Sequence, residues 1–309
     1  MIQVKNLVKR YGELVALDHF DLEVREGEIF GLLGPNGSGK TTAINCMLSL
    51  LKYSKGDISL FGEPMSPNNY SVKRRIGVVM QNVAVFNELT VVENIDYFCG
   101  LYVPHKKERE PLVNEAIAFT GLEDYRKFLP KKLSGGLLRR LNIACGIAHK
   151  PDLIFLDEPT VAVDPQSRNH ILEGIKELNK NGATIIYTSH YMEEVEQICT
   201  RIMIMDSGKA VATGTKKELK AMIRAGEKLT IDIPDLPDNV LGQIKSLDGL
   251  VECAYDNGLL TARCVSDSHC LSLVLDTLRR EGIGFGRVFS EPPTLNDVFL
   301  EITGKDLKD

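Results

Sequence analysis

The stretch Gly34-Pro35-Asn36-Gly37-Ser38-Gly39-Lys40-Thr41 decides the fold class of this chain. It fits the pattern G-x-x-x-x-G-K-[ST], a loop whose backbone N–H groups cradle phosphates. Residues 28–33 before it, which are apolar after Glu28, predict a buried strand, and residues 41–51 after it predict a helix. A tight loop between strand and helix directs N–H donors and the positive end of the helix dipole to one point. We therefore expect a polyphosphate site here.

The side chains of this loop predict how a nucleotide would be held. Glycines let the backbone approach the phosphates without a Cβ atom in the way. Lys40 is expected to reach the β- and γ-phosphates, and Thr41 to place its hydroxyl on Mg²⁺. The predicted phosphate-binding residues are Gly34, Pro35, Asn36, Gly37, Ser38, Gly39, Lys40, Thr41 and Thr42.

Composition narrows the class of protein. The chain has 309 residues, about two domains, and its 43% hydrophobic and 26% charged residues are typical of a soluble globular protein. A net charge of −5 argues against nucleic acid as a partner. The absence of a bilayer-length apolar run and of a signal peptide predicts a cytoplasmic protein unless a partner holds it elsewhere. The seven scattered cysteines lack zinc-ligand spacing, so we expect all of them to be reduced and structural.

Several predicted strands end in polar side chains. Because ligands bind at the carboxyl ends of strands in open α/β sheets, these side chains are candidates for chemistry. Asp157 is expected to hold Mg²⁺ through water, and Glu158 to polarise an attacking water molecule. Gln81 is in a position to reach Mg²⁺ or that water, and His190 to donate to the γ-phosphate. Taken alone, a Gln or a His at a strand end is more often structural.

Three further features of the first domain are an antiparallel β edge, a helical insert and a second glycine-containing loop. Residues 1–24 alternate apolar and polar side chains and predict an antiparallel β edge, whose first turn carries Tyr11. Tyr11 either stacks on a nucleotide base or is a solvated turn residue. Residues 82–150 predict a helical insert. Within it, Ser134, Gly135 and Gly136 begin a helix, either as a plain N-cap or as a loop that binds the nucleotide of another copy.

In this order, the motifs resemble the ATP-binding subunit of an ABC transporter over about residues 1–224. Residues 34–41 match the Walker A motif, 133–136 the signature motif and 153–158 the Walker B motif. Single residues match the Q-loop, the D-loop, the switch histidine and the aromatic residue that stacks on adenine: Gln81, Asp164, His190 and Tyr11.

The resemblance implies ATP and Mg²⁺ as cofactors and a head-to-tail dimer, formed with itself or with a paralogous subunit. Each ATP would lie between the Walker A motif of one subunit and Ser134, Gly135, Gly136 and Asp164 of the other. Hydrolysis would drive a separate membrane permease that contacts the insert near residues 81–94. The chain would then be peripheral on the inner face of the cell membrane.

Two positions depart from the family pattern. Leu137 stands where a polar residue, often Gln, usually follows the signature, although Arg140 keeps the family's basic residue. The loop before Asp164 reads Val161-Ala162-Val163, which is unusually apolar and bears on communication between subunits rather than on ATP binding. A subunit that binds ATP without turnover therefore stays open as an alternative, although Glu158 argues against it.

The tail, residues 227–309, predicts a small α+β domain. The order β-α-β-β-α-β suggests a ferredoxin-like fold. A hairpin at Asn257-Gly258 would set Glu252 opposite Arg263, with Val251 on the core face. Also on that face are Cys253, Tyr255, Leu260, Ala262 and Cys264. A helix is expected over 268–281 and a strand over 284–290, and we expect the tail to brace or regulate the dimer.

The predicted fold class is α/β. An ABC-type ATPase domain with a mixed sheet core, an antiparallel β edge and a helical subdomain at about 82–150 occupies residues 1–226, and an accessory domain follows. Residues 291–300 resemble the tail of ATPases that serve bacterial ABC-2-type drug and lipid exporters, which implies export. A soluble ABC ATPase with a non-transport role remains an alternative. A GTPase is disfavoured because residues 179–182, Asn-Lys-Asn-Gly, lack the guanine-reading Asp. The exported molecule is not encoded here, since the permease selects it.

Overall fold

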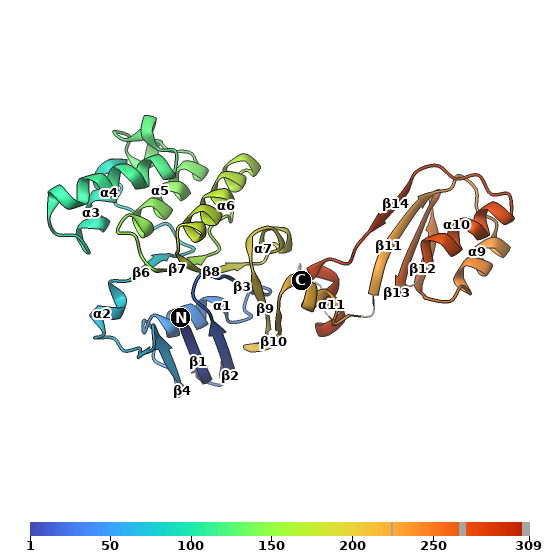
Figure 1. The fold of residues 1–309 in the computed structure, drawn as a ribbon, viewed down its shortest axis with the longest axis horizontal. Helices are drawn as coiled ribbons and strands as arrows, with labels where there is room; N and C mark the ends of the chain where they lie inside the picture. The colour runs from blue at the N-terminus through green and yellow to red at the C-terminus, as the bar shows by residue number, and fades with distance from the viewer. Residues whose placement is uncertain (224, 266–269, 305–309) are drawn as a thin grey trace. The chain divides into compact units, whose positions relative to one another are not determined.

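The structure, a computed structural model, describes residues 1–223, 225–265 and 270–304. Two compact units make up the chain: Met1–Thr215 and a second unit that begins at Lys216 (Figure 1). The second unit includes helix α8 (Lys216–Lys220), which packs against α11 (Leu295–Thr303). In the described part of the chain, every helix is too short or too polar to cross a bilayer.

A six-stranded mixed sheet forms the centre of the first unit. Every residue of β3, β7 and β8 is buried, as expected of parallel strands covered on both faces. On β3, Phe30 and Leu32 face the core that contains α1 (Lys40–Met47), whereas Gly31 faces Val195 of α7 (Met192–Ile198). The strand order is β10 (Lys209–Gly214), β9 (Arg201–Asp206), β3 (Ile29–Leu33), β8 (Thr184–Ser189), β7 (Leu153–Asp157) and β6 (Ile76–Val79), with only β10 antiparallel among these.

The predicted antiparallel edge is confirmed and forms a sheet of its own. β1 and β2 pair through the turn at Tyr11, and α1 lies between this sheet and the central one, in a single apolar core. α1 ends at Met47 rather than at the predicted residue 51, and Ser49 beyond it has a left-handed φ of 53°. The order is β2 (Leu14–Val24), β1 (Ile2–Tyr11), β4 (Lys55–Leu60) and β5 (Glu63–Pro64).

The helical insert packs around an apolar core of its own. Thr90 and Glu93 form a capping box at the start of α3 (Val91–Gly100). α4 contains Pro111 in its interior, and α5 begins at Gly135, directly after its N-cap residue Ser134. The helices of the first unit not yet given are α2 (Tyr70–Lys73), α4 (Lys106–Phe119), α5 (Gly135–Ile147) and α6 (Pro165–Lys180), with 3₁₀ turns at Glu123–Tyr125 and Pro130–Lys132.

The second unit contains a four-stranded antiparallel sheet with two helices packed into its apolar core. Its sheet order is β12, β13, β11, β14, so the first and last strands of the unit are neighbours at one side. In chain order its elements are β11 (Ala225–Asp232), α9 (Asp238–Lys245), β12 (Leu250–Asp256), β13 (Leu259–Val265), α10 (Cys270–Arg280) and β14 (Val288–Glu291).

The predicted hairpin register is confirmed except at its far end. Glu252 lies opposite Arg263, but a bulge then pairs Leu250 with Cys264, so Val251 is 52% exposed instead of facing the core. β14 begins at Val288 rather than at the predicted residue 284, and it ends at Glu291 rather than at residue 290. α10 begins at Cys270, and the predicted helical residues 268–269 lie outside the described residues.

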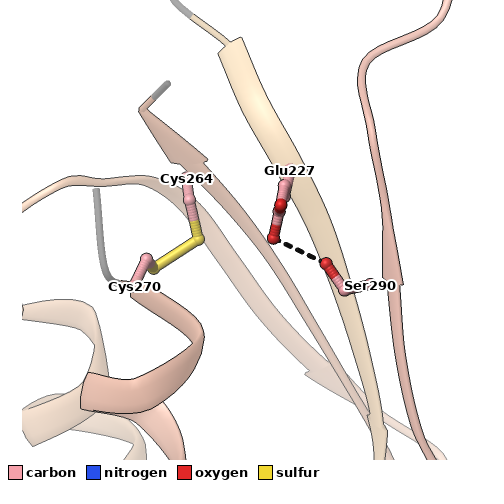
Figure 2. The surroundings of a disulfide bond; sticks show 4 residues. All are labelled: Glu227, Cys264, Cys270 and Ser290. Carbon is pink, nitrogen blue, oxygen red and sulfur yellow. Dashed lines mark hydrogen bonds between the residues drawn. A yellow bond between two sulfur atoms is a disulfide. The ribbon is translucent and has the colours of Figure 1, made fainter. Parts of the chain in front are cut away.

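The prediction that all cysteines are reduced was wrong for one pair. Cys264 and Cys270 form a disulfide, with Cα atoms 6.0 Å apart, that joins the end of β13 to the start of α10 (Figure 2). Spacing alone did not indicate the pair, because the fold brings these two ends together. In the same view Ser290 donates a 2.7 Å hydrogen bond to Glu227, between β14 and β11. Cys46 and Cys145 are buried thiols, as expected.

Candidate functional site

The loop between β3 and α1 has the backbone shape that a phosphate cradle requires. Gly37 and Gly39 have φ angles of 82° and 106°, in the left-handed region that favours glycine. A Cβ atom on Gly39 would lie 2.8 Å from the carbonyl oxygen of Ala16, and one on Gly34 would overlap the carbonyl oxygen of Met205. A side chain at either position would therefore distort the loop, directly in front of the N-terminus of α1.

Lys40 folds back over this loop. Its ammonium donates to the carbonyl oxygens of Gly34 at 2.7 Å and Pro35 at 3.0 Å, and it lies 3.6 Å from Oε1 of Glu158. Burial lowers the pKa of Lys40, while the carboxylate of Glu158 acts in the opposite direction. A positive charge is thus held at the mouth of the cradle by groups that an anion could replace.

Ser38 provides a test of whether phosphates fit. Its side chain is buried, and its Oγ has no hydrogen-bond partner among the described residues. A buried hydroxyl without a partner costs about 1–3 kcal/mol, so such a group usually marks a place for a ligand or water. A phosphate oxygen beside the loop would accept its proton, so the residues present fit a nucleotide polyphosphate.

Asp157 lies at the carboxyl end of β7 and is fully buried. Thr41 donates a 2.8 Å hydrogen bond to its Oδ2, and Thr188 of the neighbouring strand β8 donates one of 2.6 Å to its Oδ1. These hydrogen bonds fix the carboxylate beside the Thr41 hydroxyl. Together they offer the oxygen ligands that Mg²⁺ prefers.

The predicted residues converge on Glu158, which directly follows β7. Gln81 donates from Nε2 to Oε2 of Glu158 at 3.2 Å, and Nδ1 of His190 lies 3.4 Å from the same oxygen. Lys40 approaches the other carboxylate oxygen. The backbone of Glu158 has a left-handed φ of 48°, and its N–H donates to the hydroxyl of Thr188 at 2.9 Å. The fold holds Glu158 in an unfavourable backbone conformation that points its carboxylate into the site.

A cavity of about 480 Å³ opens over the loop. Tyr11 borders it from the end of β1; the residue is 46% exposed, and the Lys9 ammonium lies 4.5 Å from the ring centroid. A flat ring at the rim of a phosphate site suits stacking on a base. The lining residues are Tyr11, Leu14, Val15, Ala16, Asn36, Gly37, Gly39, Lys40, Thr41, Thr42, Gln81, Glu158, Ser207 and Gly208.

The second glycine loop forms a separate cluster that does not line this cavity. Ser134 caps α5 by accepting from the N–H of Leu137 at 3.3 Å. Asp164 caps α6 by accepting from the N–H of Ser167 at 2.9 Å, and hydrogen bonding to Ser167 lowers the pKa of Asp164. A Cβ atom on Gly136 would lie 3.1 Å from Oδ2 of Asp164. Within one chain, therefore, the two glycine loops do not face the same space.

Arg139 was not predicted as a site residue, although the sequence pairs it with Arg140 in an otherwise apolar helix. It is 4% exposed, and desolvation by burial lowers its pKa. Its guanidinium donates to the carbonyl oxygens of Pro159 at 2.8 Å, Gln81 at 2.7 Å and Met80 at 3.2 Å, and also to that of Glu158. One side chain thus ties together the two strand ends that carry Gln81 and Glu158.

Comparison with known proteins identifies the family. The protein-family model for the ABC transporter family matches residues 17–161. The linearmycin resistance ATP-binding protein LnrL of Bacillus subtilis (strain 168) is 36% identical over 100% of both chains. The Nod factor export ATP-binding protein I of Cupriavidus metallidurans is 35% identical over 100% of this chain and 99% of its own. The daunorubicin resistance ATP-binding protein DrrA3 of Streptomyces coeruleorubidus is 34% identical over 99% and 96%.

Solved structures agree with this relationship. The dimeric structure of MJ0796, a bacterial ABC transporter cassette, matches with a TM-score of 0.64 and 28% identity, covering 70% of this chain and 98% of that one. A second structure of MJ0796, bound to ADP and Pi after hydrolysis, matches equally well, with a TM-score of 0.64. The chain therefore belongs to the ATP-binding proteins of ABC transporters, and it is an ATPase that converts ATP to ADP and phosphate.

Proposed function

We propose that this chain powers an ABC-2-type exporter by hydrolysing ATP as a dimer and driving a separate membrane permease. The observation that carries the hydrolytic part is the convergence of Lys40, Gln81 and His190 on the buried carboxylate of Glu158. Full-length similarity to a Nod factor export protein and to two drug resistance proteins supports export. The transported molecule is chosen by the permease.

In the proposed reaction, Glu158 accepts the proton of a water molecule that attacks the γ-phosphorus. The hydrogen bond from Gln81 and the nearby His190 hold the carboxylate in place. His190 would also donate a hydrogen bond to the γ-phosphate. Lys40 and the loop N–H groups hold the β- and γ-phosphates, with Thr42 and Asn36 at the cavity wall. ADP and phosphate then leave.

A magnesium ion fits beside the loop. Thr41 and Asp157 present a hydroxyl and a carboxylate joined by a 2.8 Å hydrogen bond, and Gln81 adds an amide oxygen at the cavity wall. Bound there with ATP, the ion would neutralise charge on the phosphates. Tyr11 would stack on the adenine.

Dimerisation would complete the site. Because Ser134, Gly135 and Gly136 do not line the cavity of their own chain, they are available to a nucleotide bound by another subunit. Asp164, packed beside Gly136, would sit at the same junction. The partner is a second copy or a paralogous ATPase subunit, as in the dimeric structures that this chain resembles.

The permease would hold the chain on the inner face of the cell membrane, with contacts near residues 81–94. We assign residues 1–226 to the ATP-binding domain, its helical subdomain to about 82–150, and residues 227–309 to an accessory domain that braces or regulates the dimer. Its β-α-β-β-α-β order and its sheet order β12, β13, β11, β14 support a ferredoxin-like fold.

The test is the Mg²⁺-dependent ATPase rate as a function of protein concentration, for the native chain and Glu158→Gln. A native rate that rises faster than linearly and disappears in the variant is expected from a dimer with Glu158 as the base. Glu193→Gln, an exposed glutamate, serves as the charge-matched control. Full activity in Glu158→Gln would refute the assigned role. Negligible rates for both native chain and variant would point to dependence on the permease, which co-purification from solubilised membranes would then test.

A further inference from the structure

A buried carboxylate outside the assigned site has no role in the chemistry proposed above. Glu194 lies in the first turn of α7 and is 3% exposed, whereas its neighbour Glu193 faces solvent. Removing a carboxylate from water costs several kcal/mol unless charged or hydrogen-bonding partners compensate. The surroundings of Glu194 must therefore be built to receive a negative charge.

Four side chains supply that compensation. Oε2 of Glu194 accepts hydrogen bonds from the hydroxyls of Thr160 at 2.7 Å, Tyr187 at 2.6 Å and Ser189 at 3.1 Å. Oε1 lies 3.3 Å from Nε of Arg168, at the start of α6. Three hydroxyls thus converge on one carboxylate oxygen.

These partners belong to the segments that carry the reacting side chains. Thr160 is two residues beyond Glu158, and Ser189 directly precedes His190. The hydroxyl of Ser189 also accepts a 2.9 Å hydrogen bond from the backbone N–H of Tyr191. The residues directly before and after His190 are therefore joined to each other, and Ser189 joins them to Glu194. Both segments are thereby fixed relative to one carboxylate.

We propose that Glu194 is a positioning residue for ATP hydrolysis: it joins the Thr160 and Ser189 segments and so keeps His190 and Glu158 in register, 3.4 Å apart. Arg168 extends the connection to α6, whose N-cap is Asp164. A structural change in the loop that ends at Asp164 would therefore be transmitted to His190 through Arg168 and Glu194, even though residues 161–163 of that loop are apolar. The inference rests on the hydrolytic role proposed for Glu158.

The experiment measures kcat, KM and the affinity for a fluorescent ATP analogue in the native chain, Glu194→Gln and Glu193→Gln. Both substitutions remove one negative charge from the first turn of α7, so the exposed position is a matched control. Small displacements of reacting groups cost up to about 100-fold in rate, so Glu194→Gln is expected to lower kcat about 10- to 100-fold. KM and analogue affinity should stay within about 2-fold, since no phosphate contact changes.

A second pair of variants separates positioning from folding. Thr160→Val removes the donor to Glu194 and keeps the shape, whereas Thr160→Ser keeps the donor. The proposal expects Thr160→Val to lower kcat as Glu194→Gln does, and Thr160→Ser to restore most of the native rate.

A native kcat in Glu194→Gln would overturn the inference, and so would equal effects of the two Thr160 variants. If kcat and analogue affinity fell together, with loss of the folded baseline, Glu194 would be a structural residue only. Full activity of Glu158→Gln would instead overturn the proposed function itself, and the inference with it.

Discussion

Arg139→Met should destabilise the first unit strongly. Methionine fills a similar volume but donates no hydrogen bond, so the carbonyl oxygens of Met80, Gln81, Glu158 and Pro159 would lose their shared donor. Each buried carbonyl oxygen left without a donor costs about 1–3 kcal/mol, so we expect a total loss of about 4 kcal/mol. For a unit of this size each kcal/mol shifts the melting temperature by about 2–4 °C, so we expect a decrease of roughly 10 °C.

The assay is thermal unfolding followed by circular dichroism, with Arg74→Met, an exposed arginine, as the control. The control should melt within about 2 °C of the native chain, as surface substitutions usually change stability by no more than about 0.5 kcal/mol. Below its melting temperature, Arg139→Met should also lose ATPase activity, since Gln81 and Glu158 are no longer tied together. A melting temperature for Arg139→Met equal to that of Arg74→Met would refute the reasoning.

Three further predictions concern the loop, a buried histidine and the disulfide. Gly39→Ala should weaken ATP binding at least about 10-fold in equilibrium titrations, because a Cβ atom would lie 2.8 Å from the carbonyl oxygen of Ala16 and the φ angle is 106°. Burial lowers the pKa of His149 to about 4, so the unfolded chain binds the proton first as the pH falls. The free energy of unfolding should therefore drop by roughly 3 kcal/mol between about pH 6.5 and pH 4. Urea denaturation at several pH values measures this drop, which should be smaller in His149→Phe. Reducing the Cys264–Cys270 disulfide, which spans a sequence separation of 6, should cost the second unit about 2 kcal/mol, visible as a lower unfolding midpoint with dithiothreitol than without. An unchanged midpoint, with alkylation of the denatured, unreduced chain showing seven free thiols instead of five, would mean that the bond does not form.

Features decided by neighbouring residues were predictable. The turn at Asn257-Gly258 set the hairpin, and Glu252 lies opposite Arg263 as its alternation required. Thr90 and Thr294 begin helices through capping boxes, whose donors and acceptors are three residues apart. The limits of such reasoning appear at Val251, where a bulge that no local signal marks shifts the pairing.

Features that depend on distant segments were not predictable. Arg139 meets carbonyl groups from residues near 80 and near 158, and Glu194 meets side chains from the loop after β7 and from the end of β8. Nothing in the local pattern of either helix distinguishes these charges from solvated ones. Cys264 and Cys270 are similarly brought together by the end of one strand and the start of one helix.

By itself, the sequence determined the phosphate loop, because glycine backbone freedom, a lysine and a helix start are all encoded within eight consecutive residues. It also determined which strand ends carry Gln81, Asp157, Glu158 and His190, since apolar runs that stop at polar residues are local patterns. Only the tertiary structure decided that Gln81 and His190 meet at the carboxylate of Glu158, and that the second glycine loop does not line the same cavity. The physical reason is that strand order, and with it which chain segments become neighbours, is selected by the packing of the whole core.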